Sequence, residues 1–252
     1  MRDKRLVAAS FSRAAPKYDR VAGLQRRIAD QLSCWLPDVS VPTLLDLGSG
    51  TGYANAWLAQ RSEFLINLDL AEGMLKFARG SDSKGAFVAG DAEALPLADG
   101  SIDLLWSSLA LQWSEQPQLL MQELARVVKP GGRLLISTLG PSTLYELRES
   151  WAAVDQGQHV NNFVSPQQWF SVDVPLRCER HQTDTEVELY TEVGQLLREL
   201  RTLGAHNVNP ERRHGLGGQA ALKGMMQHYQ GYRTAQGLPA TYEVHYLEFI
   251  RQ

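Results

Sequence analysis

The chain has 252 residues, of which 44% are hydrophobic, and it is long enough to fold as one domain with a sizeable core. Its 25 basic and 28 acidic residues nearly balance, which excludes a general attraction to nucleic acid or to an anionic membrane. The first residues are charged, and no stretch approaches the roughly 18 apolar residues of a membrane span or the shorter apolar stretch of a signal peptide. We therefore expect a soluble cytoplasmic protein without a nucleic-acid or membrane partner.

The first half predicts an alternation of strands and helices. Apolar residues recur at intervals of three and four over 21–36, which indicates an amphipathic helix ending at Pro37. Such alternation over 40–140 predicts a parallel sheet with helices on both faces and a ligand outside the carboxyl ends of its strands. The expected strands are 43–47, 64–68, 86–89, 102–106 and 133–138, and the expected helices are 52–60, 72–79 and 115–128.

After residue 140 the pattern changes. We expect 186–190 and 242–249 to complete the sheet as an antiparallel pair, with helices within 142–175 and 212–235 forming a partial lid. The predicted chain is one α/β domain made of N-terminal cap helices, a ligand-binding core and a C-terminal part for a second ligand. Their boundaries are 1–39, 40–140 and 141–252, and further elements are expected as a helix at 142–154, a helix starting at Ser165-Pro166, a strand at 178–189 and a helix at 191–203.

Cysteine and histidine carry no predicted chemistry. Cys34 and Cys178 have neither metal-ligand spacing nor partners for a disulfide framework, so we expect packing residues in a reducing compartment. We expect no metal site. Three histidines are expected to be structural, namely His206, His214 and His245.

The most informative segment is 44–52, which reads Leu-Leu-Asp-Leu-Gly-Ser-Gly-Thr-Gly. Glycines at alternate positions let the backbone turn sharply out of a strand and admit a ligand against bare main chain, with helix N–H groups pointing at it. The spacing differs from the dinucleotide fingerprint Gly-x-Gly-x-x-Gly. A nucleotide-like ligand is indicated, and the alternative is a tight strand-to-helix turn without a ligand.

Two acidic positions follow the glycines in register. Asp69 ends the second strand, 23 residues after Asp46, where a carboxylate can accept both hydroxyls of a ribose. Asp91 follows the third strand, and Lys129-Pro130-Gly131-Gly132 precedes the fifth. Over about 40–140 this order resembles the class I S-adenosylmethionine methyltransferases. The resemblance implies a Rossmann-like sheet, mostly parallel with an antiparallel C-terminal strand, and S-adenosylmethionine as cofactor.

The resemblance also assigns the cofactor contacts. The three glycines pass beneath the methionine moiety, Asp46 reaches its ammonium, and Asp69 binds the ribose. Met74 has a core role as its alternative, and Asp91 has a surface turn as its alternative. The full set of implied cofactor residues is Asp46, Gly48, Gly50, Gly52, Asp69, Leu70, Met74, Asp91, Ala92 and Leu109. Gln112 and Trp113 either orient an acceptor or pack.

Segments outside residues 40–140 identify a more specific family within this class. Phe11-Ser-Arg-Ala-Ala-Pro-Lys-Tyr-Asp19, Ala22-Gly-Leu-Gln25, Gly204-Ala-His-Asn207 and Gly237-Leu-Pro-Ala-Thr-Tyr242 are similar to the malonyl-acyl-carrier-protein O-methyltransferases of biotin synthesis. This family methylates the free carboxylate of a malonyl thioester, which starts pimeloyl and biotin synthesis. The substrate is then malonyl on an acyl-carrier protein, or malonyl-coenzyme A. A carboxylate is a nucleophile at neutral pH, so positioning and water exclusion dominate and no general base is proposed.

This resemblance implies two groups of polar residues. Arg201 is the candidate to bind the substrate carboxylate, with a solvated helix face as the alternative. Tyr18 on a mobile N-terminal segment is the candidate to donate its hydroxyl, with packing of the first helix as the alternative. A carrier protein is an acidic partner, and its expected contacts are Arg26, Arg27, Arg212 and Arg213.

Two other functions stay open. One is a methyltransferase for another small carboxylic acid or for a quinone ring, although a carbon acceptor normally needs a base and the sequence shows none. The other is a regulator that binds S-adenosylmethionine without chemistry. A regulator predicts a lost acid at position 69 or a broken glycine turn, and both are intact.

Overall fold

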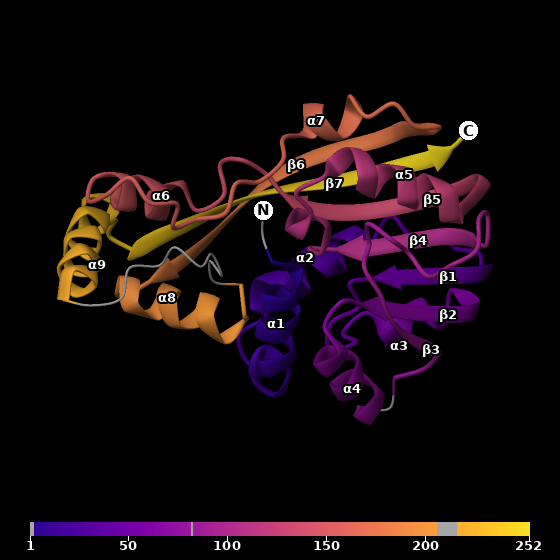
Figure 1. Ribbon diagram of the computed structural model, residues 1–252, viewed down its shortest axis with the longest axis horizontal. Helices are drawn as coiled ribbons and strands as arrows, with labels where there is room; N and C mark the ends of the chain where they lie inside the picture. The colour runs from indigo at the N-terminus through magenta and orange to yellow at the C-terminus, as the bar shows by residue number, and fades with distance from the viewer. Residues whose placement is uncertain (1–2, 82, 206–215) are drawn as a thin grey trace.

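The computed structural model describes residues 3–81, 83–205 and 216–252. Within these ranges one sheet of seven strands, in the order β3-β2-β1-β4-β5-β7-β6, forms the centre of the molecule (Figure 1). The first five strands in the chain pair in parallel, and the other two are added in antiparallel pairings. The strands are β1 (Val41–Leu47), β2 (Ser62–Asp69), β3 (Ala86–Ala89), β4 (Ile102–Ser108), β5 (Val128–Leu139), β6 (Leu176–Tyr190) and β7 (Leu238–Arg251).

Alternate side chains of the strands face two separate hydrophobic clusters. Leu44 and Leu104 join the cluster with α2 (Gly23–Ser33), whereas Leu45 and Leu105 join the cluster with α5 (Pro117–Val127). The sheet is therefore buried on both faces, as the apolar strands predicted. The chain order reverses between β1 and β4, and this reversal places a crevice at the carboxyl ends of the two strands.

The helix predicted over 52–60 is shorter than expected. Only α3 (Asn55–Leu58) is helical, because Gly52 has φ +85° and turn hydrogen bonds occupy the preceding residues. The side chain of Asn55 then bonds to the Lys84 backbone, which fixes the loop before β3.

The N-terminal segment forms a helix, α1 (Lys4–Tyr18), so Tyr18 ends a helix of 15 residues. Asp3 caps the helix by accepting the Arg5 N–H at 2.9 Å. α1 packs closely on α4 (Glu72–Gly80), where the Gly73 N–H donates to the Ser12 hydroxyl. A Cβ added at Gly73 would lie 2.6 Å from the Cβ of Ser12, so glycine permits this approach.

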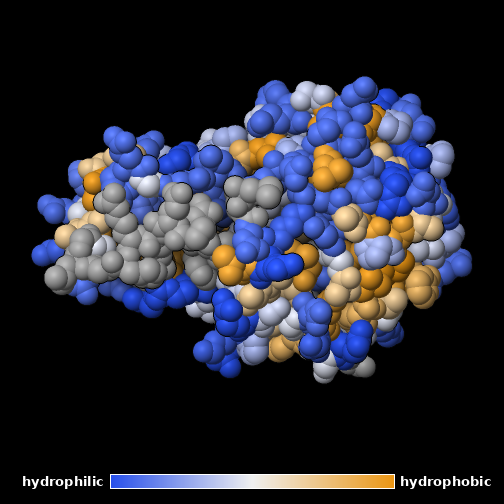
Figure 2. Space-filling model, viewed as in Figure 1, coloured by the Kyte–Doolittle hydropathy of each residue, from blue (hydrophilic) through white to orange (hydrophobic). Residues whose placement is uncertain are grey.

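The strand predicted at 178–189 is confirmed as β6, but its antiparallel pairing with β7 is longer than the expected pair of 186–190 and 242–249. β6 and β7 stay paired from Leu176–Arg251 to Tyr190–Leu238, and only the half of β7 at 244–250 also pairs with β5. The free half extends to the left of Figure 1 and carries three helices. These are α6 (Tyr145–Ala152), α8 (Val193–Thr202) and α9 (Leu216–Tyr229), while α7 (Pro166–Phe170) lies against α5. In Figure 2 the described surface of this arm is mostly hydrophilic.

The predicted lid segments lie away from the crevice. α6 and α9 pack on each other and on the outer half of β7, so none of their described residues lines the cavities at the strand ends. α1 takes that covering position, and α8 supports it through the Ser10 hydroxyl, which donates to the Gly204 carbonyl at 3.1 Å.

Candidate functional site

Two adjoining cavities lie at the carboxyl ends of the parallel strands. The larger has a volume of about 630 Å³, which suits a small-molecule ligand, and the smaller has about 70 Å³. Tyr18, Gly48, Gly50, Ser108 and Leu109 line both. The predicted residues Asp69, Leu70, Met74, Asp91, Ala92 and Trp113 line only the larger cavity, and Asp46 and Arg26 line only the smaller.

The glycine turn directly after β1 forms the floor that the cavities share. Gly48 has φ +77° and Gly50 has φ +54°, values that favour glycine. A Cβ at Gly48 would come within 2.2 Å of the Ala110 Cβ, whereas a Cβ at Gly50 would meet no atom within 4 Å. Gly48 therefore permits the close approach to Ala110, and Gly50 leaves bare backbone facing a cavity. Gly52 lies outside both walls and packs near Ala78.

Asp69 links the turn to the end of β2. Its two carboxylate oxygens accept the Gly50 N–H at 2.9 Å and the Ala71 N–H at 2.7 Å. Burial raises the pKa of Asp69, and these two N–H bonds oppose the rise. The carboxylate is thus fixed at the cavity wall with further lone pairs able to accept hydroxyl donors.

The smaller cavity gathers buried polar atoms that have no hydrogen-bond partner among the residues the structure describes. They are Gln25 Oε1, Arg26 Nε, Asp46 Oδ2 and Ser49 Oγ. Asp46 is 2% exposed, and burial together with the nearby charge of Asp69 raises its pKa to about 8. Buried polar groups are normally paired, so this set indicates a small ligand with both an ammonium and an anionic group.

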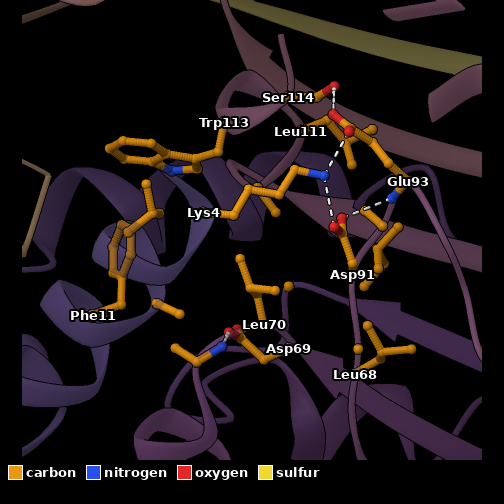
Figure 3. A pocket seen from close by; sticks show the side chains of 18 of the residues that line it. Lys4, Phe11, Leu68, Asp69, Leu70, Asp91, Glu93, Leu111, Trp113 and Ser114 are labelled. Atoms are coloured by element: carbon orange, nitrogen blue, oxygen red, sulfur yellow. Dashed lines mark hydrogen bonds and ion pairs between the residues drawn. The ribbon is translucent and has the colours of Figure 1, made fainter. Parts of the chain in front are cut away.

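A lysine that sequence reasoning missed bridges the far wall of the larger cavity (Figure 3). The Lys4 ammonium lies 2.6 Å from Asp91 and 2.5 Å from Glu93, whose other oxygen accepts the Ser114 hydroxyl. Asp91 also accepts the Glu93 N–H at 3.0 Å. The bridge ties the start of α1 to the loop after β3. Lys4 is separated in the chain from Asp91 by 87 positions and from Glu93 by 89. Local sequence patterns give no signal for contacts between such distant residues.

Aromatic side chains close the cavity on the α1 side. Phe11 of α1 and Trp113 contact each other edge to face with ring centroids 5.1 Å apart, and both line the larger cavity. Burial and the charges of Asp69 and Asp19 raise the pKa of Tyr18, so its hydroxyl keeps its proton and can donate. Trp113 therefore both packs and lines the site.

The remaining predicted residues that the structure describes lie outside the cavities, except Arg26, which lines the smaller one. The Gln112 amide donates to the Leu109 carbonyl at 2.6 Å, and Gln112 lines neither cavity. Arg201 is exposed on α8 and also lines neither cavity. Arg27 pairs with Glu186 and Glu188 of β6, and Arg26 pairs with Asp19 at 3.6 Å. Arg212 and Arg213 lie outside the described residues, as do His206 and His214.

No group of three or more potential ligands for a metal ion occurs in 3–81, 83–205 and 216–252. In those same ranges no helix combines the length and apolarity needed to cross a bilayer. Both cysteines are exposed free thiols rather than buried packing residues, and His245 is buried beside Glu243 and His181 within the sheet.

The parallel sheet, the glycine turn and the acid that ends β2 define a class I methyltransferase. A family model described as "Methyltransferase domain" matches residues 45–136. A putative methyltransferase from Bacillus halodurans has the same fold, with TM-score 0.64 and 17% identity over 88% of this chain and 97% of that one. Geranyl diphosphate C-methyltransferase from Streptomyces coelicolor, solved with S-adenosyl-L-homocysteine, gives TM-score 0.52 and 15% identity over 89% of this chain and 77% of that one.

Sequence relatives define the family more narrowly. A malonyl-acyl-carrier-protein O-methyltransferase from Dechloromonas aromatica is 40% identical over 97% of this chain and 93% of its own length, and one from Hahella chejuensis is 38% identical over 96% and 88%. The chain belongs to the malonyl-acyl-carrier-protein O-methyltransferase family. The biotin biosynthesis bifunctional protein BioHC of Cellvibrio japonicus is 47% identical over 97% of this chain, which spans half the length of that relative.

The two cavities fit the S-adenosylmethionine that this class of enzyme uses. The unpartnered buried oxygens of Asp46 and Gln25 would accept hydrogen bonds from the ammonium, and Arg26 Nε would donate to the carboxylate of the same amino-acid group. Asp69 would hold the ribose in the larger cavity, which Asp91 also lines. Gln25 and Ser49 are site residues that sequence reasoning missed.

The Lys4 bridge is expected to contribute to folding stability. Replacing Lys4 with methionine leaves the buried Glu93 carboxylate without its cation, and we expect a loss of about 1 kcal/mol, low in the range for an orphaned acceptor. The loss is small because the Lys4 side chain is 38% exposed and screened by water. Urea denaturation measures it. The control is Arg5→Met, and equal losses in the two variants would contradict the role of the bridge.

Cofactor binding is expected to release a proton from Asp46. The raised pKa of about 8 means that the carboxyl holds a proton at pH 6.5 in the cofactor-free protein, and a bound ammonium favours the charged form. Calorimetry in two buffers of different ionisation enthalpy counts the released protons, and we expect about one per cofactor. Asp46→Asn should abolish the release, and an unchanged count would assign the proton to another group.

The same shift gives the stability of the cofactor-free protein a pH dependence. Between about pH 4 and pH 8 the folded protein holds a proton on Asp46 that the unfolded chain has lost, so stability falls as the pH rises through this window. Asp46→Asn should remove this pH dependence from the free energy of unfolding, which urea denaturation at several pH values measures.

Proposed function

We propose that this chain methylates the free carboxylate of a malonyl thioester carried by an acyl-carrier protein, forming the methyl ester that starts pimeloyl and biotin synthesis. The observation that carries the proposal is the buried ligand set around Asp46 beside the glycine turn, in a chain about 40% identical to relatives named for this reaction. The cytoplasmic location expected from the sequence is part of this proposal.

The chemistry asks little of the protein beyond positioning. S-adenosylmethionine, when bound, supplies an electrophilic methyl group on a sulfonium sulfur. A carboxylate has a reference pKa near 4 and is already an acceptor at neutral pH, so no side chain has to remove a proton. The described residues that line the cavities offer hydrogen-bond donors and apolar walls, which suits orientation and exclusion of water.

Tyr18 is the proposed donor to the acceptor carboxylate. Tyr18 lines both cavities, which supports a role between the amino-acid part of the cofactor and the acceptor. Its raised pKa keeps the proton on the hydroxyl, which a donor needs. Phe11, Trp113 and Leu109 line the larger cavity with apolar surface and would exclude water from the transferred methyl group.

The test uses labelled cofactor and two thioesters of the carrier protein. Wild-type protein incubated with methyl-labelled S-adenosylmethionine is expected to label malonyl-carrier protein and to leave acetyl-carrier protein unlabelled, because acetyl has no free carboxylate. Label on both thioesters would mean that the methyl group is transferred to an atom other than the malonyl carboxylate. Label on neither would overturn the proposed substrate and leave a small carboxylic acid, a quinone ring or a regulatory role.

The assignment of Arg201 to the substrate carboxylate stays a proposal. Arg201 lies one turn before Gly204, which packs closely on α1. A Cβ added at Gly204 would lie 3.1 Å from the Ser10 carbonyl oxygen. Arg201→Ala is expected to raise the KM for malonyl-carrier protein and to leave the Kd of the cofactor unchanged. Kinetics and calorimetry separate the two quantities. Equal losses in both would indicate a packing role for α8.

A further inference from the structure

We propose that the outward face of α1 is the docking surface for the acidic carrier protein that delivers the malonyl thioester. The inference rests on the proposed function and concerns where the partner binds. The surface, called the α1 basic face below, consists of Arg5, Arg13, Lys17 and, just after the helix, Arg20.

The two sides of α1 have different compositions. Lys4, Val7, Ala8, Phe11 and Tyr18 line the larger cavity, and at about 100° per residue they fall on one side of the helix. Arg13 and Lys17 fall on the opposite side, Arg5 lies between the two sides at the edge of the cavity, and all four basic side chains are exposed. The helix therefore covers the site with one face and presents positive charge to solvent with the other.

The charge of this face is not neutralised within the described structure. Residues 4–18 contain no acidic residue, although acidic residues outnumber basic ones in the chain as a whole. None of the four side chains of the α1 basic face forms an ion pair with a described residue. Asp19, the acidic residue between Lys17 and Arg20, is engaged by Arg26 at 3.6 Å and by the Thr51 hydroxyl at 2.8 Å.

Of the four arginines first expected to contact the carrier protein, the two that the structure describes are less available than the α1 basic face. Arg27 is held by two glutamates of β6, and Arg26 lines the smaller cavity and lies 5.1 Å over the Tyr53 ring. Moving either to a partner would break these contacts. The α1 basic face has no such cost, so an acidic protein would gain attraction there without displacing an internal carboxylate.

The position of the face suits a substrate that arrives tethered to a protein. Arg5 is exposed and also lines the larger cavity, so the basic face reaches the cavity rim. Other exposed lining residues at this rim are Asp3, which caps α1, and Glu115 and Gln116 beyond Trp113. A carrier protein held on α1 would thus place the start of its tether beside the opening.

The test is a triple charge reversal that leaves the cavity walls intact. Arg13→Glu, Lys17→Glu and Arg20→Glu change residues that line neither cavity. The matched control reverses three exposed basic residues elsewhere with the same change in net charge, namely Lys84→Glu, Arg177→Glu and Lys223→Glu. Thermal unfolding of both variants checks that they fold, because Lys17 also lies in the last turn of α1.

The readout compares malonyl-carrier protein with malonyl-pantetheine, which has the tether without the protein. For the α1 variant we expect kcat/KM with malonyl-carrier protein to fall by about tenfold or more, because electrostatic attraction raises association rates by this order, and kcat/KM with malonyl-pantetheine to stay unchanged. The wild-type rate with the carrier protein should also fall as salt increases, and the variant should lose this dependence. The control variant should resemble wild type with both substrates.

Each other outcome overturns the docking proposal. Equal losses with both substrates would mean that α1 acts through the cavity, and equal losses in both variants would reflect net charge alone. Sedimentation with phosphatidylserine vesicles that depends on Arg13, Lys17 and Arg20, together with unchanged kcat/KM, would identify a membrane-binding face. Failure of the wild-type protein to methylate either malonyl thioester would overturn the proposed function itself. This result differs from that of a variant whose kcat/KM falls equally with malonyl-carrier protein and malonyl-pantetheine.

Discussion

Replacing Asp69 with alanine is expected to weaken S-adenosylmethionine binding by about 1.5–3 kcal/mol, the range for hydrogen bonds to a charged group, or roughly 10- to 150-fold in Kd. Asp69 is positioned for this contribution by two backbone N–H groups, from Gly50 and Ala71, which fix the carboxylate at the wall of the larger cavity. Alanine removes the acceptor and also frees the Gly50 N–H, so both effects act in the same direction. Isothermal titration calorimetry measures the Kd.

Two further variants separate the charge from the turn. Asp69→Asn keeps one oxygen acceptor and the size of the side chain, so the loss of affinity should lie between those of wild type and alanine. Glu72→Ala removes an exposed carboxylate three residues away, whose partner is Lys76, and should leave the Kd unchanged. Unchanged affinity in Asp69→Ala would refute the assignment of the ribose to this residue.

Replacing Gly48 with alanine is expected to lower the free energy of unfolding by about 2–5 kcal/mol, combining left-handed backbone strain with overpacking. Gly48 has φ +77°, and its added Cβ would lie 2.2 Å from the Cβ of Ala110. Neither atom can move without shifting the backbone after β1 or after β4. Urea denaturation of the cofactor-free protein measures the loss.

Two matched variants divide this loss into its parts. Gly50→Ala has the same backbone strain at φ +54° and no atom within 4 Å, so its stability should fall by only about 1–2 kcal/mol. Its methyl group would face the cavity, so cofactor binding should suffer more than folding. Gly48→Ala combined with Ala110→Gly removes the clash and should recover the overpacking part. No recovery would show that the turn, and not Ala110, limits this position.

Sequence patterns predicted the features that depend on neighbours along the chain. The glycine turn and the acid that ends β2 follow strands of clear apolar character, and the structure brings both to the same cavity wall. The alternation of strands and helices predicted the parallel part of the sheet, and the antiparallel addition of β7 and β6 was also confirmed. The fold class follows from these local signals.

Contacts between distant segments could not be predicted in the same way. Lys4 is one of several basic residues at the start of the chain, and only the packing of α1 on α4 brings it to Asp91 and Glu93. Likewise, Arg27 was expected on a partner surface because nothing in the local sequence indicates that the two glutamates of β6 lie beside it. Tertiary packing decided both cases.

The cover over the cavity shows the same limit. Pro16 interrupts the sequence of α1, and its alanines favour a helix but give little amphipathic contrast, whereas 142–175 and 212–235 were expected to supply the helices of a lid. The structure places α6 and α9 at the far end of β7, where they bury Met225, Tyr229 and Leu147. Helical propensity predicted that helices exist there but not which of them would cover the site.

The two edge strands of the sheet, β3 and β6, differ in length, but both disfavour pairing with another chain. β3 has only four residues, and β6 has 15 residues with charged side chains along much of its exposed length. A short edge strand offers few free backbone groups to another chain, and charged side chains on a long edge strand make the approach of a second strand costly. The described sheet is therefore poorly suited to recruit strands from neighbouring molecules, and the protein should resist edge-to-edge aggregation when it is concentrated.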